Sequence, residues 1–78
     1  MVYNMKSVKI TTEYIELQQL LKIEDFISSG GAAKYFLAEN KVLVNNELEN
    51  RRGRKLYPKD VVKILGKEFI IEWFNLLI

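Results

Sequence analysis

The most constraining feature of this chain is that none of its 78 residues is cysteine or histidine. A chain of this length buries only about 60% of the surface that its unfolded form exposes, so many small domains are reinforced by disulfides or zinc. This sequence has neither disulfides nor the usual zinc ligands. Its 49% hydrophobic residues must therefore supply the stability by apolar packing, and we expect a single domain over residues 1–78.

The same absence weakens the case for an enzyme. Without histidine or cysteine there is no imidazole base, no thiolate nucleophile and no serine–histidine pair. Two pairs of acids remain, Glu24 with Asp25 and Glu47 with Glu49, but acids at these spacings usually lie on a solvated surface. We expect nothing nearby to shift their pKa values. The sequence therefore predicts a protein without catalytic activity or cofactor.

Apolar spacing predicts two short helices. One helical face carries leucines at i, i+3 and i+4: Leu17, Leu20 and Leu21. We expect this first helix over residues 17–26. A second helix is expected over residues 31–39, because Ser28 and Ser29 can cap its start and Asn40 can end it with a positive φ.

The rest of the chain predicts strands joined by turns. Short strands are expected over residues 7–10, 42–44, 47–49 and 61–65. Asn45-Asn46 suits a hairpin turn with positive φ, Pro58 suits the second position of a turn, and Gly66-Lys67 suits the next turn. Residues 69–73 fit either a strand paired with residues 61–65 or a helical stripe, and we favour the strand. This combination indicates the α+β fold class.

Charge is distributed unevenly along the chain. Residues 50–63 carry six cations against the single acid Asp60, a balance of +5, whereas residues 11–49 carry three lysines against seven carboxylates, a balance of −4. Residues 50–55, here called the basic arm, hold four of the six cations and lack apolar alternation, so we expect a loop or an irregular edge. One positive face on a nearly neutral domain is typical of proteins that bind phosphates. The alternatives are a solvated loop or pairing with acids of the same chain.

A second candidate phosphate site lies where the second helix begins. Gly30 and Gly31 permit close approach of a ligand to the free N–H groups there, and Lys34 follows in the first turn. A cation at that place opposes the helix dipole unless an anion offsets it. The alternative is that the glycines form an ordinary loop. Tyr35 and Tyr57 could stack on RNA bases, although packing in the core or at its rim is the commoner role.

Taken in order, these motifs resemble the small RNA-binding domain named after ribosomal small-subunit protein S4, and in particular its stand-alone bacterial YaaA-like members. The resemblance covers residues 10–64. Its first part is the leucine-rich first helix, which ends in Leu21-Lys22. Four motifs then follow in order: Gly30-Gly31-x-x-Lys34, Val42-x-Val44-Asn45, Asn50-Arg51-Arg52-Gly53-Arg54-Lys55-Leu56 and Asp60-Val61-Val62.

This resemblance implies two helices packed on a small curved antiparallel sheet, known as the alpha-L RNA-binding motif. It also implies that structured RNA, most often ribosomal or transfer RNA, binds across the helix pair and the adjoining loop. Asn46 and Lys59 depart from the family pattern, which commonly has glycine at both places. The family core would span residues 10–64, with an apolar C-terminal extension over residues 68–78.

The functional expectation is therefore a non-catalytic RNA-binding protein, acting in ribosome assembly or translation. The candidate RNA-binding residues are Gly30, Gly31, Lys34, Lys41, Arg51, Arg52, Arg54, Lys55 and Lys59. The alternative is a protein-interaction module that docks a partner through the apolar tail and the basic arm. The tail is expected to complete the core or to form a homodimer or partner contact.

The chain is also expected to be cytoplasmic and not to bind membranes. Its N-terminus lacks the apolar core of a signal peptide, and its longest apolar-rich stretch, residues 68–78, is shorter than the ~20 residues that a membrane span needs.

Overall fold

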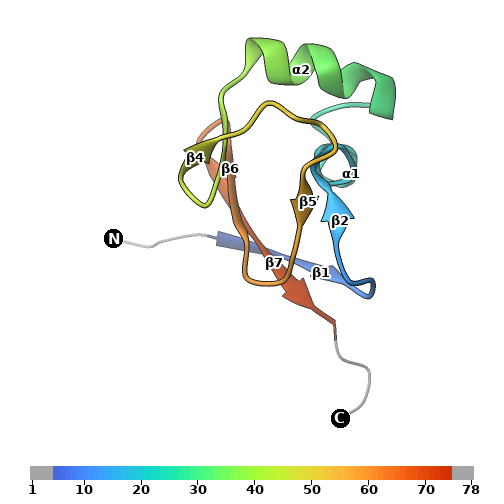
Figure 1. The fold of residues 1–78 in the computed structure, drawn as a ribbon, viewed down its shortest axis with the longest axis vertical. Helices are drawn as coiled ribbons and strands as arrows, with labels where there is room; N and C mark the ends of the chain where they lie inside the picture. Colours follow the sequence, from blue (N-terminus) through green and yellow to red (C-terminus); the bar gives the residue numbers. More distant parts are fainter. Residues whose placement is uncertain (1–4, 75–78) are drawn as a thin grey trace.

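The computed structural model describes residues 5–74 and has an α+β fold, with two helices beside a five-stranded sheet (Figure 1). In chain order the elements are β1 (Met5–Ile10), β2 (Ile15–Glu16), α1 (Leu17–Ile23), the 3₁₀ turn η1 (Gly30–Ala32), α2 (Ala33–Glu39), β3 (Val42–Val44), β4 (Glu47–Leu48), β5 (Lys55–Leu56), β6 (Val61–Ile64) and β7 (Lys67–Trp73). The predicted fold class is confirmed. No helix in the described part of the chain is long and apolar enough to cross a membrane.

The main sheet has the strand order β1-β7-β6-β3-β4. All of its pairs are antiparallel except the β1–β7 pair, which is parallel and runs from Met5 opposite Glu68 to Ile10 opposite Trp73. The sheet is therefore mixed, whereas the resemblance implied an antiparallel one. β2 and β5 form a separate two-residue antiparallel ladder.

The predicted strand near the C-terminus is confirmed, and it lies inside the sheet. β7 pairs with β6 as expected, and Phe69 and Ile71 are buried. The turn before it falls at Leu65 (φ 48°) and Gly66 (φ 80°), one residue earlier than predicted, so β6 ends at Ile64. The last part of the apolar extension, residues 75–78, lies outside the described residues.

The core is assembled from the helix faces and the inward side chains of the strands. The three leucines predicted for the first helix are fully buried. Ala33 and Leu37 of α2 are buried too, and Phe36 packs against the core. The predicted apolar face of the first helix is confirmed.

The first helix is shorter than predicted because the chain leaves it to bury an aromatic ring. α1 ends at Ile23, and Asp25 adopts a left-handed φ of 62°. This turn brings Phe26 against Phe36 and Phe69, with ring centroids 5.7 Å and 6.0 Å away.

The second helix ends at Glu39 as predicted, but its start and the conformation of both predicted capping residues differ from the prediction. The chain enters α2 through η1, and Ser29 makes no side-chain capping hydrogen bond. Asn40 is extended (φ −127°, ψ 136°) rather than left-handed. Its side-chain Nδ2 instead donates to the Phe36 carbonyl at 3.1 Å, which satisfies a carbonyl at the end of the helix.

The hairpin turn and the turn at Pro58 form where the sequence predicts them. Asn45 (φ 51°) and Asn46 (φ 69°) form the predicted left-handed turn between β3 and β4, although β4 ends at Leu48. In the turn over residues 57–60, Lys59 has a φ of 83° and the Asp60 N–H donates to the Tyr57 carbonyl at 3.0 Å. Lys59 thus occupies a conformation that favours glycine.

Candidate nucleic-acid interface

The backbone of the basic arm is fixed against the start of α1. The Leu17 N–H donates to the Arg54 carbonyl at 2.8 Å, and the Gln18 N–H donates to the Arg52 carbonyl at 2.9 Å. These donors belong to the first turn of the helix, where backbone N–H groups have no partner within the helix. In Figure 1 the arm, coloured yellow, runs from β4 past α2 to β5. The predicted loop is confirmed apart from Lys55, which belongs to β5.

A buried carboxylate holds two of the arginines. Glu49 is only 6% exposed, although it was predicted to lie on a solvated surface. It accepts hydrogen bonds from Nε (2.9 Å), Nη2 (3.0 Å) and the backbone N–H (2.9 Å) of Arg51. It also accepts one from Nη1 of Arg54 at 2.7 Å. Glu49 therefore neutralises part of the local charge and sets the direction of both guanidinium groups.

These contacts shift the pKa of the carboxyl. The hydrogen bond from the Arg51 side chain is the largest cause that lowers the pKa of Glu49 from 4.5 to about 2, and burial acts in the opposite direction. The same pair raises the pKa of Arg51. The expectation that nothing would shift the pKa of this acid was wrong. The direction keeps Glu49 ionised at neutral pH, which does not suit a general acid.

Aromatic rings fix the other end of the arm. The Lys55 ammonium lies 4.9 Å from the centre of the Tyr14 ring, a cation–π contact. Tyr57 packs against Tyr14, with centroids 5.6 Å apart, and remains 41% exposed. Tyr57 thus lies at the rim beside the arm, whereas Tyr35 on α2 is 69% exposed.

The start of the second helix lies beside the start of the first. A Cβ placed on Gly30 would be 3.4 Å from Oε1 of Gln18, the residue whose N–H binds the arm. Gly31 is exposed in η1, and Lys34 is exposed on the first turn of α2. Gln18 therefore contacts both regions that the sequence marked as candidate phosphate sites.

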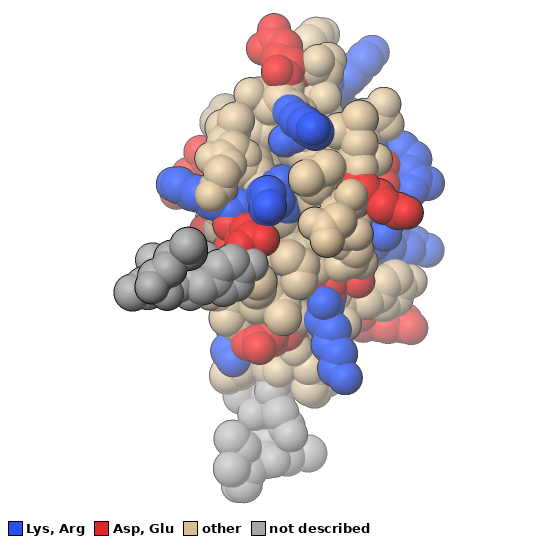
Figure 2. All heavy atoms as spheres, turned by 90° about the vertical axis from the view of Figure 1, so that its left-hand side faces the viewer, with Lys and Arg blue, Asp and Glu red and all other residues tan. Residues whose placement is uncertain are grey.

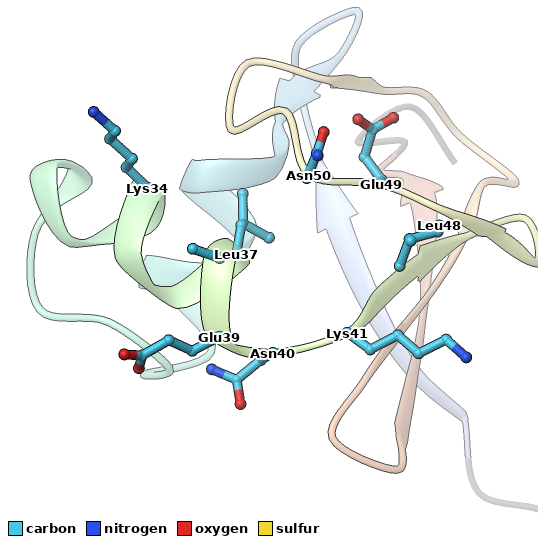
Figure 3. A pocket seen from close by; sticks show the side chains of 9 residues that line it. Lys34, Leu37, Glu39, Asn40, Lys41, Leu48, Glu49 and Asn50 are labelled. Carbon is cyan, nitrogen blue, oxygen red and sulfur yellow. The ribbon is translucent and has the colours of Figure 1, made fainter.

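The remaining candidate residues line three separate hollows. Lys34 and Lys41 border a groove of about 460 Å³ between α2 and the β3–β4 hairpin, and their side chains point away from each other (Figure 3). Arg51, Arg54 and Lys55 line a second groove, of about 640 Å³. Lys59 borders a third hollow, on β7. Arg52 is exposed and lines none of these hollows.

On the face that Figure 2 shows, the charged side chains do not form a uniform positive surface. Figure 2 shows lysines and arginines interspersed with acids over the side that lies at the left of Figure 1. Cations gather along its right-hand edge, which is the side turned towards the viewer in Figure 1, and acids lie among them.

Sequence reasoning missed three residues that organise this region: Tyr14, Gln18 and Glu49. For Glu49 a signal was present, because the acid lies two residues before Arg51 and five before Arg54. The contacts of Gln18 and Tyr14 join segments more than thirty residues apart, and no local pattern indicates them.

Comparison with known proteins finds a matching family model and similar proteins. A family model described as the S4 domain matches residues 8–72. The chain is 61% identical over 59 residues to the Bacillus subtilis (strain 168) protein named "Probable ribosome maturation protein RlbA", covering 76% of this chain and 83% of that protein. It is 36% identical over 53 residues to YbcJ of Escherichia coli (strain K12), covering 68% and 76% of the two chains.

A solved structure resembles the whole fold. The solution structure of YbcJ from E. coli, described as revealing an alfaL motif involved in RNA-binding, superposes with a TM-score of 0.64 and 29% identity. The superposition covers 92% of each chain.

Proposed function

This chain belongs to the S4 domain family, and we propose that it binds structured ribosomal or transfer RNA, without catalysing a reaction, through the basic arm and the start of α2. The resemblance read from the sequence motifs is confirmed by the family model. One relative is named for ribosome maturation, and a solved one is described as having a motif involved in RNA-binding. The first name supports a role in ribosome assembly, and we propose that the protein acts there or in translation, in the cytoplasm.

One observation supports the proposal most: the arm is cationic and its backbone is fixed. The carbonyls of Arg52 and Arg54 are bound by the first turn of α1. A fixed backbone holds the arm cations at set spacings, as a fixed array of phosphates requires. A flexible basic segment would follow any polyanion instead. The arrangement therefore favours folded RNA and positions the protein on phosphates without reading sequence.

The test is a titration with a structured RNA at several salt concentrations. Arg52 and Lys55 are the two arm cations that do not contact Glu49, so they can be changed to glutamine without leaving a buried charge unpaired. If each binds one phosphate, the double variant should flatten the slope of log K against log salt by about 1.5, at about 0.7–0.9 per contact.

A matched variant controls for net charge. Lys63→Gln with Lys67→Gln removes the same two charges from β6 and β7, away from the arm, and should change the slope much less. Equal slopes for the two double variants would remove the arm from the binding surface.

A protein-interaction role remains as a second candidate because two large apolar side chains are exposed at the end of the sheet. Trp73 is 53% and Phe74 is 42% exposed. A pull-down with and without ribonuclease separates the two functions. Partners that ribonuclease releases support the RNA function, and partners that it leaves bound support direct protein contact.

A further inference from the structure

A groove with both cationic and aromatic walls lies between the basic arm and the turn over residues 57–60. It has a volume of about 640 Å³ and is lined by Arg51, Gly53, Arg54, Lys55, Tyr57 and Asp60. That volume is within the range of about 300–1,000 Å³ that is typical of small-molecule sites, so it can hold one nucleotide.

Three cationic side chains that line this groove are held by contacts with Glu49 and Tyr14. Glu49 binds both guanidinium groups, at 2.9 Å and 3.0 Å for Arg51 and at 2.7 Å for Arg54. Lys55 is held over the Tyr14 ring at 4.9 Å. A cation that is already oriented loses less conformational entropy when an anion binds. The basic wall of the groove is therefore preorganised.

The part of the groove formed by Tyr57 and Asp60 is fixed as well. Tyr57 packs on Tyr14, and its backbone N–H donates to Oδ2 of Asp60 at 2.8 Å. Oδ1 of Asp60 accepts a hydrogen bond from the Asn45 side chain at 3.0 Å. The Asp60 carboxylate repels phosphate and can accept hydrogen bonds from base N–H groups. It therefore distinguishes a base-binding end of the groove, beside Tyr57, from a phosphate-binding end, beside the arginines.

We propose that this groove binds a single unpaired nucleotide that projects from a folded RNA, with its base against Tyr57 and its phosphate on Arg51 and Arg54. This site rests on the proposed function and adds to it a contact with a base. A base inside a helix is stacked on both faces and cannot reach a tyrosine in a groove. Unpaired bases in loops and bulges can stack on aromatic side chains, and they cost least to displace.

The test compares two RNA hairpins that differ by one bulged nucleotide, which carries 2-aminopurine as a fluorescent base. The protein should bind the bulged hairpin more tightly and quench its fluorescence. Tyr57→Leu should remove that preference, a loss of about five- to hundredfold for one stacked base, and leave binding of the paired hairpin unchanged. Tyr57→Phe should retain both the preference and the quenching.

Two further variants isolate the groove. Tyr35→Leu removes a more exposed tyrosine that lies outside it, on α2, and should change neither affinity. Gly53→Leu adds an uncharged side chain to a residue that lines the groove, and the fold should tolerate it because a Cβ at Gly53 meets no atom within 4 Å. It should reduce binding of the bulged hairpin only.

Each other outcome overturns a stated claim. If Tyr57→Leu weakens both hairpins equally, the ring supports the arm and no base site exists. If the unaltered protein binds both hairpins with equal affinity, the nucleotide site fails while the RNA function stands. If it binds neither hairpin, even at low salt, the proposed RNA function itself fails.

Discussion

At the scale of single residues, Glu49 determines how the arginines of the arm are presented. A surface ion pair contributes little to stability, because solvent screens it and two side chains must be ordered. Glu49 differs because its carboxylate is buried and receives four hydrogen bonds from Arg51 and Arg54. Removing those donors would leave a buried charge without partners, which is far more costly than losing a surface pair.

We predict that Glu49 makes folding stability depend on acid pH. Its pKa is about 2 in the folded protein and about 4.3 in an unfolded chain, so the charged form stabilises the fold. This contribution is complete above the unfolded value and is lost as pH falls from about 4.5 to about 2. Glu49→Gln should cost about 2–3 kcal/mol at pH 7 and almost nothing near pH 2. Urea unfolding of both proteins at pH 7 and near pH 2 measures this.

The same substitution should also weaken RNA binding at neutral pH, even though it removes a negative charge beside the site. Glu47→Gln is the matched control, because it makes the same charge change on an exposed residue of the neighbouring strand. Tighter binding by folded Glu49→Gln would mean that Glu49 competes with phosphate for the arginines instead of orienting them.

At the scale of secondary-structure elements, the sequence correctly predicted the features that depend only on residues close together in the chain. The leucine spacing identified α1, and Asn45-Asn46 identified the hairpin, because a helical face and a left-handed turn involve only neighbouring residues. The parallel pairing of β1 with β7 joins residues about sixty positions apart, and no spacing within either strand encodes its direction.

The same limit applies to the candidate site. Charge density found the arm, but the groove depends on Tyr14 and Glu49, which reach it through tertiary contacts. The serine caps failed for a related reason. The serines were predicted to cap the α-helix directly, but a short 3₁₀ turn lies between Ser29 and α2.

The turn over residues 57–60 supports a prediction at this scale. Lys59 has a φ of 83°, a conformation that costs a residue with a side chain about 1–2 kcal/mol, whereas glycine adopts it readily. Glycine also makes the unfolded chain more flexible, which offsets about half of the gain. Lys59→Gly should therefore stabilise the fold by about 0.5–1 kcal/mol in urea unfolding.

Lys59→Ala is the control, since it removes the same charge and keeps the unfavourable φ. It should give no increase in stability. Because Lys59 lines the hollow on β7 and not the groove beside the basic arm, neither variant should change affinity for a structured RNA by more than about twofold. A larger loss with both would place Lys59 among the RNA contacts.

At the scale of the whole molecule, the arrangement joins two helix starts and the arm into one region. Gln18 on α1 binds the Arg52 carbonyl and lies against Gly30 of η1. Exposed N–H groups near Gly31 and the cations of the arm could then contact neighbouring phosphates of the same RNA. The net charge of only +2 means that affinity must come from these local contacts rather than from overall attraction.

The final prediction tests whether the two regions act as one surface. The protein should bind a folded RNA more tightly than a single strand of equal length, because only folded RNA offers phosphates at fixed spacing. Gly31→Asp should reduce affinity for the folded RNA by at least about fivefold, since its carboxylate would repel a phosphate there. The fold should tolerate the change, because a Cβ at Gly31 comes no closer than 4.0 Å to Ser29 Oγ and an acid suits a helix start.

Ala38→Asp is the matched control, because it places the same charge on an exposed residue near the other end of α2. Circular dichroism must first show that both variants are folded, and titration of each with the folded RNA and the single strand then gives four affinities. A shared surface requires that Gly31→Asp lower the preference for folded RNA while Ala38→Asp leaves that preference intact. If both variants lose affinity equally, the added charge acts through the overall field of the protein, and the arm alone remains as the RNA contact.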